Sequence, residues 1–236
     1  NSLDKKMLKH FEALIQKGYY MLTSEIPYPS DAEAIAAIIE IGKKLYAKGM
    51  VASNDGNISV RVGKDAVWIT PTGVSKGELV PDILLKLNLD GKIIEGSSKK
   101  STETAMHLRM YKENGEIRTV VHAHPAFATA FAVAGIPLDT VIYPEAYAVI
   151  GKIPIAPYAT PGTQEVPDSV APFARTHNAV LLANHGALTW GKTPKQAWFR
   201  MESLENYARI TMYSKYFLGQ ANPIPDAKVK EIQIFD

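Results

Sequence analysis

The stretch Val120-Val121-His122-Ala123-His124-Pro125 decides how the chain folds, because it combines an apolar run with two histidines and a proline. In a β-strand, side chains at positions i and i+2 lie on the same face, so His122 and His124 project together. Two such imidazoles can bind one divalent metal ion, since a Zn–N bond is only about 2.0–2.1 Å long. Pro125 cannot continue the strand pairing and suits the first turn of a helix, which places the pair at a strand end. Two structural histidines on a partly buried strand would fit this pair equally well.

Composition narrows the class of protein. The chain has 236 residues, of which 46% are hydrophobic and 21% charged, as is usual for a globular protein. The net charge of +2, without a basic cluster, gives no argument for nucleic-acid binding. The absence of cysteine excludes disulfides and thiolate ligands, so any metal must be held by His, Asp or Glu. No apolar run approaches the roughly 20 residues of a membrane span, and no signal-peptide core is found, so we expect a cytoplasmic protein.

The first part of the chain predicts two helices separated by prolines. A helical spacing of apolar residues covers residues 3–22, and Pro27 and Pro29 interrupt it. Ser30-Asp31-Ala32-Glu33 has the pattern of a capping box and predicts a second helix that ends at Gly49. We therefore expect an N-terminal helical extension, residues 1–29, followed by one main domain, residues 30–236.

The rest of the chain alternates short strands and helices. Turn signals around residues 63–65 and at Asp90-Gly91 predict two β-hairpins. Helices are expected over residues 101–114, 126–134, 163–177 and 193–218, the second of them buried because it is almost wholly apolar. Short strands are expected on either side of His185-Gly186. The fold class predicted is a single α/β domain with a mostly antiparallel central sheet flanked by helices.

Further candidate residues lie near turns and helix ends. His185 directly follows the apolar strand 180–183, where a histidine has a structural role more often than a metal-binding one. Glu103 stands in the first turn of a helix behind Ser101 and Thr102, and free N–H groups at such a helix end can bind phosphate. His107 lies four residues further on the same helix face and is expected to pack beside the site. His10 and His177 are expected at the surface.

Six short motifs together resemble one known family. They are Gly56-Asn57-Ile58-Ser59, Thr70-Pro71-Thr72-Gly73, Ser101-Thr102-Glu103, His122-Ala123-His124, Pro157-Tyr158 and Asn184-His185-Gly186. In this order they resemble the class II aldolase/adducin family, and the likeness runs over about residues 31–218. The family fold, a central antiparallel sheet between helices, agrees with the pattern of strands and helices.

The resemblance implies a metal centre and a phosphate site. It implies Zn²⁺, or another divalent ion, held by His122, His124 and His185, with Glu103 as a displaceable fourth ligand and catalytic acid/base. It implies a substrate phosphate bound by the following residues: Gly56, Asn57, Thr72, Gly73, Ser101 and Thr102. Tyr143 stands where family aldolases carry a catalytic tyrosine that reaches a neighbouring subunit, within a homotetramer. A structural zinc is the alternative, but structural sites usually have four protein ligands and favour cysteine.

The expected activity is that of a zinc-dependent aldolase, a carbon–carbon lyase. It would reversibly cleave a ketose 1-phosphate of the L-fuculose 1-phosphate type to dihydroxyacetone phosphate and a small aldehyde. A sugar-phosphate epimerase, dehydratase or decarboxylase of the same family is the alternative, although the epimerases typically carry aspartate where Glu103 stands. A non-catalytic scaffold like the adducin head is a further alternative, but those heads lack the metal histidines.

Overall fold

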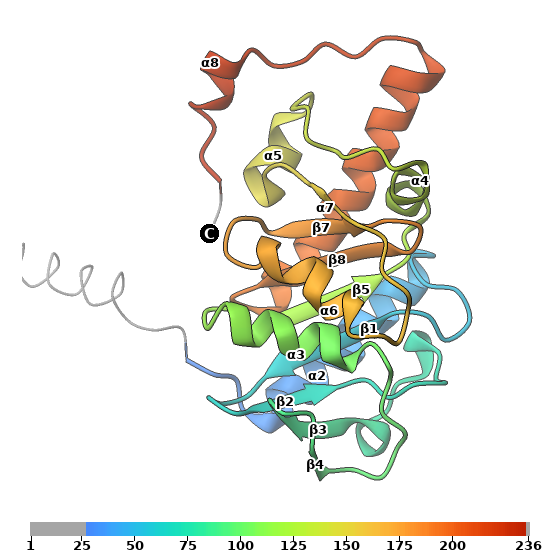
Figure 1. Ribbon diagram of the computed structural model, residues 1–236, viewed down its shortest axis with the longest axis vertical. Helices are drawn as coiled ribbons and strands as arrows, with labels where there is room; N and C mark the ends of the chain where they lie inside the picture. The colour runs from blue at the N-terminus through green and yellow to red at the C-terminus, as the bar shows by residue number, and fades with distance from the viewer. Residues whose placement is uncertain (1–26, 235–236) are drawn as a thin grey trace, which may run out of the picture.

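An eight-stranded sheet runs through the middle of the computed structural model, which describes residues 27–234 (Figure 1). The strand order is β4-β3-β2-β1-β5-β8-β7-β6, and every neighbouring pair is antiparallel except β6 and β7. The mostly antiparallel sheet of the sequence prediction is therefore confirmed. The strand bounds are β1 Asn57–Arg61, β2 Ala66–Ile69, β3 Leu85–Asn88, β4 Ile93–Glu95, β5 Thr119–Ala123, β6 Ile155–Ala156, β7 Ala179–Leu182 and β8 Gly186–Gly191.

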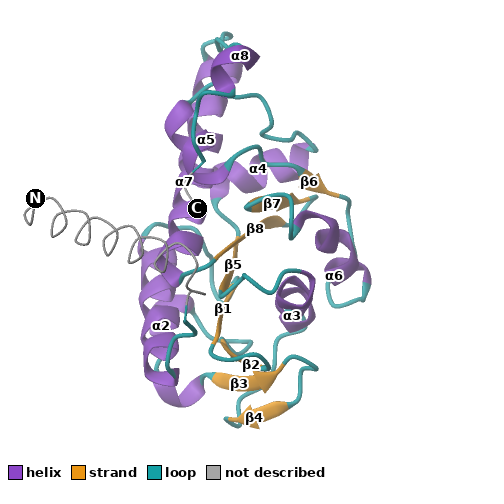
Figure 2. Cartoon of the chain, turned by 90° about the vertical axis from the view of Figure 1, so that its left-hand side faces the viewer, coloured by secondary structure: helices purple, strands orange, loops and turns teal. Residues whose placement is uncertain are grey.

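Helices cover both faces of the sheet. Figure 2 shows α2 and α7 on one side and α3 and α6 on the other. The α-helix bounds are α2 Asp31–Ala47, α3 Thr104–Glu113, α4 Ala126–Ala134, α5 Pro144–Ile150, α6 Glu165–Val170, α7 Pro194–Thr211 and α8 Asp226–Val229. The shorter turns are 3₁₀ helices η1 Lys76–Glu78, η2 Pro81–Ile83 and η3 Ala171–Phe173, and α7 continues into the π-helix η4 Met212–Phe217. Every helix within residues 27–234 is too short or too polar to cross a membrane.

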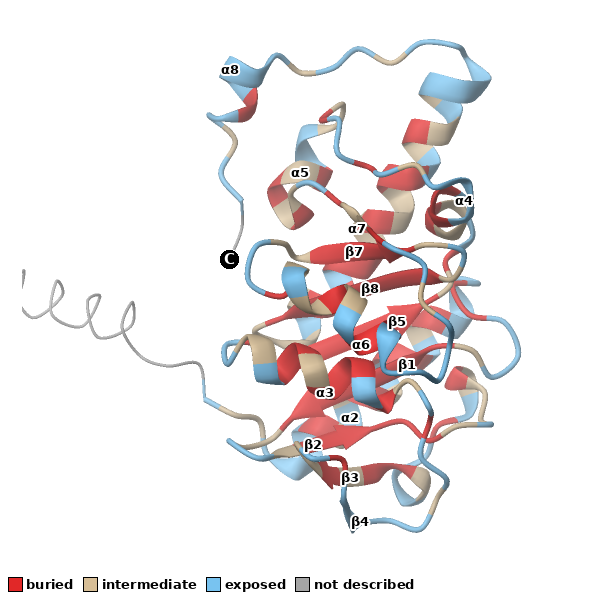
Figure 3. Cartoon of the chain, in the orientation of Figure 1, coloured by how far each residue is buried: buried red, intermediate tan, exposed pale blue. Residues whose placement is uncertain are grey.

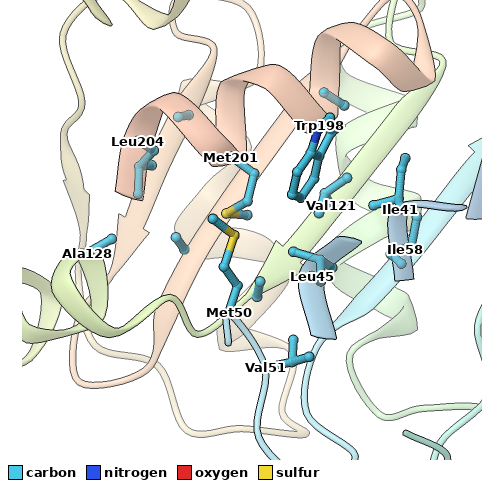
Figure 4. Close-up of a cluster of buried hydrophobic side chains, with 14 of the residues drawn as sticks. Ile41, Leu45, Met50, Val51, Ile58, Val121, Ala128, Trp198, Met201 and Leu204 are labelled. Atoms are coloured by element: carbon cyan, nitrogen blue, oxygen red, sulfur yellow. The ribbon is translucent and has the colours of Figure 1, made fainter. Parts of the chain in front are cut away.

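Strand β5 lies in the middle of the sheet and divides two cores. Val121 and Ala123 point into the core under α2 and α7, whereas Val120 points into the core under α3 and α6. Figure 4 shows the first core, in which Trp198 of α7 packs near Val121. Both faces of β5 are buried, as Figure 3 shows for the strands at the centre of the sheet. His122 alternates with Val121 and so faces α3.

Most elements expected from the sequence are present. The capping box forms as predicted, because Ser30 Oγ accepts a hydrogen bond from Glu33 N while Ser30 N donates to the Glu33 carboxylate. Both hairpins form, with Gly91 in the left-handed region at φ +83°. The long helix expected near the end of the chain forms as α7, and it buries an apolar face: Trp198, Met201, Leu204 and Ala208.

Other predictions were only partly right. Helix α4 buries one face only, because Val133 is 56% exposed while Phe131 is buried. The helix expected over residues 163–177 is shorter: α6 gives way to η3, where Pro172 has no N–H to donate. Helix α5 and strand β6 were not predicted. The helix expected over residues 3–22 lies outside the described residues, so the division at residue 29 stays a prediction.

The short helix η1 is pressed against α2 through two glycines. A Cβ atom on Gly42 would lie 2.5 Å from the carbonyl oxygen of Lys76 and 2.7 Å from Cδ1 of Leu79. A Cβ atom on Gly77 would lie 2.7 Å from the ring of Tyr46. Only residues without a side chain allow the two helices to approach this closely, so the backbone of η1 is fixed by α2.

We expect Gly42→Ala to destabilise the protein by about 1–3 kcal/mol, because the added methyl group collides with backbone that cannot move aside cheaply. This cost should exceed the gain of up to about 1 kcal/mol that alanine brings to a helix. Gly63→Ala is the control, since its Cβ would meet no atom within 4 Å. Chemical denaturation of both variants measures the difference, and equal stabilities would show that η1 is not held by this contact.

Candidate metal and phosphate site

Three histidines and one glutamate meet where β5 ends. His122 is the second-last residue of β5, His124 directly follows the strand, and His185 lies in the turn between β7 and β8. A ring nitrogen from each histidine lies within 4.8 Å of the others, and the ring centroids are 4.8–5.0 Å apart. The cluster expected from the sequence is therefore formed by the fold.

Glycine makes the approach of the β7–β8 turn possible. A Cβ atom on Gly186 would lie 2.6 Å from Cδ2 of His124 and 2.7 Å from the carbonyl oxygen of Ala123. Asn184 adopts a left-handed backbone conformation, φ +59°, which asparagine tolerates better than most residues. The tight turn thus brings His185 against the end of β5.

The orientation of the rings fits a divalent metal ion. His122 Nδ1 lies 2.9 Å from the carbonyl oxygen of Ala187 and donates its hydrogen there, which leaves Nε2 with a lone pair. His124 Nδ1 lies 3.3 Å from the Asp55 carboxylate, and its Nε2 lies 3.1 Å from Nε2 of His122. With the hydrogens of both rings on Nδ1, the two Nε2 lone pairs face each other at this distance and repel unless a cation lies between them. Ligands of a tetrahedral zinc are roughly 3.3–3.4 Å apart, close to the separation found here.

Glu103 completes the cluster. It is the N-cap residue of α3, and its Oε1 lies 3.2 Å from Nε2 of His122 and 3.1 Å from Nε2 of His185. Burial alone would raise the pKa of Glu103, but the charges and hydrogen bonds of the two histidines hold it well below its usual range. Glu103 is therefore a carboxylate at neutral pH.

The pKa values of His122 and His124 are shifted in opposite directions. Burial would lower the pKa of His122, but the adjacent Glu103 carboxylate outweighs burial and raises it. Burial and the neighbouring charges of His122 and His185 lower the pKa of His124 to about 4. His124 is therefore neutral at pH 7 and has a lone pair free for a metal.

The segments expected to bind phosphate lie beside this cluster. Asn57 pairs with His122 in the sheet, and its Nδ2 donates to Ser101 Oγ at 3.4 Å. Ser101 Oγ in turn accepts from the backbone N–H of Glu103. Thr72 N donates to the carbonyl oxygen of Lys99, which ties the loop carrying Thr72 to the approach to α3. These bonds bring three separate segments together at the N-terminus of α3.

The other three residues expected to bind phosphate, Gly56, Gly73 and Thr102, are next to Asn57, Thr72 and Ser101 in the sequence. Gly56 and Gly73 both have left-handed backbone conformations, φ +78° in each case. A Cβ atom on Gly56 would lie 2.8 Å from the carbonyl oxygen of His122, so the loop passes directly against β5. Thr102 lies between Ser101 and Glu103 and is exposed.

Tyr143 does not join the cluster within one chain. It is the N-cap residue of α5 and is partly buried against the core under α7. Within residues 27–234 no hydrogen bond or ring contact connects it to Glu103 or to the three histidines. Its catalytic role, which requires a second copy of the chain, stays a prediction.

Sequence reasoning missed two residues near the site. Asp55 contacts His124, and Lys76 is 1% exposed although Ser75-Lys76-Gly77-Glu78 has the composition of a solvated turn. His107 was expected to pack beside the site, and it is buried with Nδ1 2.8 Å from Ser59 Oγ. His177 is only partly buried and lies against Phe173, whereas His10 lies outside the described residues.

Comparison with known proteins now gives the family. The family model described as Class II Aldolase and Adducin N-terminal domain matches residues 36–212, more than half of the chain. The protein belongs to this family. It shares the family's helix-flanked sheet, and the resemblance found in the sequence motifs is thereby confirmed.

Individual relatives differ in their activities. A 3-oxo-tetronate 4-phosphate decarboxylase of Pectobacterium atrosepticum is 33% identical and covers 79% of this chain and 87% of its own length. A 5-deoxy-D-ribulose 1-phosphate aldolase of Bacillus thuringiensis serovar kurstaki is 34% identical, with 83% of this chain and 91% of that protein covered. A solved L-fuculose 1-phosphate aldolase superposes with a TM-score of 0.80 at 30% identity, covering 86% of this chain and 95% of that one. These three relatives are thus named for more than one reaction on phosphorylated sugars or sugar acids.

We expect His185→Ala to lower the affinity for Zn²⁺ by at least about tenfold, because one of three imidazole ligands is lost. The chain should still fold, since His185 lies in a turn at the edge of the core. His177→Ala is the control, because His177 lies outside the cluster. Competition with a chromogenic chelator measures the affinity and circular dichroism the fold. Equal zinc affinity in the two variants would contradict the assignment of His185.

Proposed function

We propose that the protein is a zinc-dependent aldolase that reversibly cleaves a ketose 1-phosphate, of the L-fuculose 1-phosphate type, to dihydroxyacetone phosphate and a small aldehyde. The observation that carries this proposal is the position of Glu103. Its carboxylate contacts two of the three clustered histidines, while its backbone N–H is bonded to Ser101 in the segment expected to bind phosphate. A carboxylate held between a metal centre and a phosphate site can reach a carbon atom of a substrate bound to both.

The names of the relatives support the substrate class. The 5-deoxy-D-ribulose 1-phosphate aldolase and the L-fuculose 1-phosphate aldolase both act on phosphorylated ketoses, and each is at least 30% identical to this chain. The position of the candidate site agrees with this class, because a phosphate at the N-terminus of α3 would place the sugar carbons toward the histidines. Zinc is the metal proposed, since three imidazoles and a carboxylate suit it.

Each side chain has a task in this proposal. A divalent ion held by His122, His124 and His185 would supply a Lewis acid that stabilises negative charge on the substrate oxygens. The hydroxyls of Ser101 and Thr102 and the free N–H groups at the start of α3 would hold the phosphate. In the condensation direction, a carboxylate oxygen of Glu103 removes the proton from the hydroxyl-bearing carbon of dihydroxyacetone phosphate, and that carbon then bonds to the aldehyde carbon. Cleavage runs these events in reverse.

A second candidate is a sugar-phosphate decarboxylase, favoured by the 33% identity to the 3-oxo-tetronate 4-phosphate decarboxylase. Loss of carbon dioxide also leaves negative charge on the substrate, so the same site could stabilise it. Glu103 would then deliver a proton to carbon instead of removing one. An epimerase or a dehydratase would use the same cluster, whereas a non-catalytic scaffold like the adducin head would have no need of it.

The substrates separate these reactions. Zinc-loaded protein incubated with a panel of ketose 1-phosphates should release dihydroxyacetone phosphate and an aldehyde, as identified by mass spectrometry. Ribulose 5-phosphate should not be converted to xylulose 5-phosphate at a useful rate, and a phosphorylated 3-oxo acid should release little carbon dioxide. Carbon dioxide release that is faster than any ketose cleavage would make decarboxylation the activity, and faster epimerisation would make it an epimerase.

Glu103→Gln should lower the exchange of the dihydroxyacetone phosphate hydroxymethyl proton with solvent by about two to four decades, because the amide cannot act as a base. Glu113→Gln, at the other end of the same helix, is the control and should exchange at the wild-type rate. Proton nuclear magnetic resonance in deuterated water follows the reaction. Exchange that persists at the wild-type rate in Glu103→Gln would mean that another group is the base.

We also propose that the active unit is a homotetramer in which Tyr143 of one chain protonates the alkoxide at a neighbouring site. Glu103 cannot fill this role while it serves the other end of the substrate. Tyr143→Phe and Glu103→Gln chains, each poorly active alone, should regain activity when mixed after dissociation, because some sites then contain both native residues. Verified mixed oligomers that stay inactive would show that each chain completes its own site.

A further inference from the structure

Lys76 is a lysine buried beside the candidate site. Its side chain is 1% exposed, and the ammonium group donates hydrogen bonds to the carbonyl oxygens of Asn54, at 2.8 Å, and Val74, at 2.7 Å. Lysine is rarely buried without a paired carboxylate. Among residues 27–234, no carboxylate oxygen lies within 4.0 Å of this ammonium group.

The missing ion pair leaves a positive charge inside the protein. Burial lowers the pKa of Lys76 to about 8, while the more distant carboxylates of Asp55 and Glu103 act in the opposite direction. The group is therefore still mostly protonated at pH 7. A buried charge is costly unless an opposite charge compensates it, and two carbonyl groups compensate it only in part. The structure thus holds a cation whose charge a nearby anion would complement.

The two carbonyl groups belong to the loops expected to bind phosphate. Asn54 lies two residues before Gly56, and Val74 directly follows Gly73. The same two loops are joined to the start of α3, the first through Asn57 and Ser101 and the second through Thr72 and Lys99. Lys76 therefore lies behind both loops and connects them to each other.

The backbone of Lys76 is itself fixed. Its carbonyl oxygen is the atom that a Cβ on Gly42 would meet at 2.5 Å, and the next residue, Gly77, lies against Tyr46. Helix α2 thus holds η1 in place, and η1 places the ammonium group. A cation that is held this firmly needs no rearrangement when an anion binds.

We propose that Lys76 is a positioning residue for the substrate phosphate: it holds the two phosphate loops together and supplies the positive charge behind them. This inference rests on the proposed function, in that it takes the phosphate to bind at the start of α3. Lys76 does not touch the ligand, because its ammonium group is covered by the loops. It acts through their backbone and through the field of its charge, which is weakly screened at a buried position.

Zinc-loaded Lys76→Gln tests the charge, because glutamine can still donate to a carbonyl group but carries no charge. Inorganic phosphate, titrated calorimetrically, should bind at least about tenfold more weakly to this variant than to wild type. Lys76→Arg should recover most of the affinity, since it restores the charge. Lys195→Gln, which removes a lysine on α7, is the matched control and should bind phosphate as wild type does.

A purely structural role gives a different result. If Lys76 only held the loops in shape through its hydrogen bonds, Lys76→Gln, which can still donate to a carbonyl group, would keep most of its affinity for phosphate. Under the proposal, KM for the ketose 1-phosphate rises, while the slow cleavage of the unphosphorylated ketose changes by less than about twofold. Equal losses for both ketoses, or an unchanged phosphate affinity in a folded variant, would overturn the inference. If Lys76→Gln does not fold, Lys76→Met is judged by the same phosphate titration.

The phosphate titration needs no reaction, so it separates this inference from the proposed function. Wild-type protein whose phosphate affinity depends on Lys76 but that cleaves no ketose would refute the aldolase and leave the inference intact. Wild-type protein that cleaves ketose 1-phosphates, with a phosphate affinity that does not depend on Lys76, would refute the inference and leave the aldolase proposal intact.

Discussion

The structure depends on the alternation of side chains along β5. This strand has neighbours on both edges and helices over both faces, so each of its side chains must enter one buried layer or the other. Val121 and Ala123 enter the apolar layer under α2 and α7 and fix the register of the strand. His122 is then forced to the opposite face, where Glu103 lies. Slippage of β5 by one residue would exchange these faces and would put a histidine into the apolar core.

This constraint explains why so much of the site could be predicted from the sequence. The spacing of His122 and His124 and the position of Pro125 are local properties, and the strand end that they indicate is present. The cap at Ser30 and the hairpin at Asp90-Gly91 are likewise encoded within a few residues. His185 could be joined to the pair only through the family resemblance, since no periodicity links residues so far apart in the chain.

The features that could not be predicted depend on tertiary contacts. Lys76 resembles a surface residue because its neighbours are polar and flexible, and only the packing of η1 against Gly42 buries it. The sequence of helix α4 suggests complete burial because every residue in it is apolar or small, yet Val133 on one face of it is exposed. In each case the local sequence identifies the type of side chain correctly but does not predict how far the fold buries it.

The bare backbone of Gly186 has a consequence for the interpretation of other sequences. Any side chain at this position would occupy the space of the His124 ring and of the Ala123 carbonyl group, so Gly186 and the end of β5 can pack together only in this form. A homologous sequence that keeps all three histidines but carries a larger residue after the third must have moved a ring or a strand end. The His-Gly dipeptide is therefore a compact diagnostic of an intact histidine cluster, one that can be checked by inspection in the sequence of any homologue.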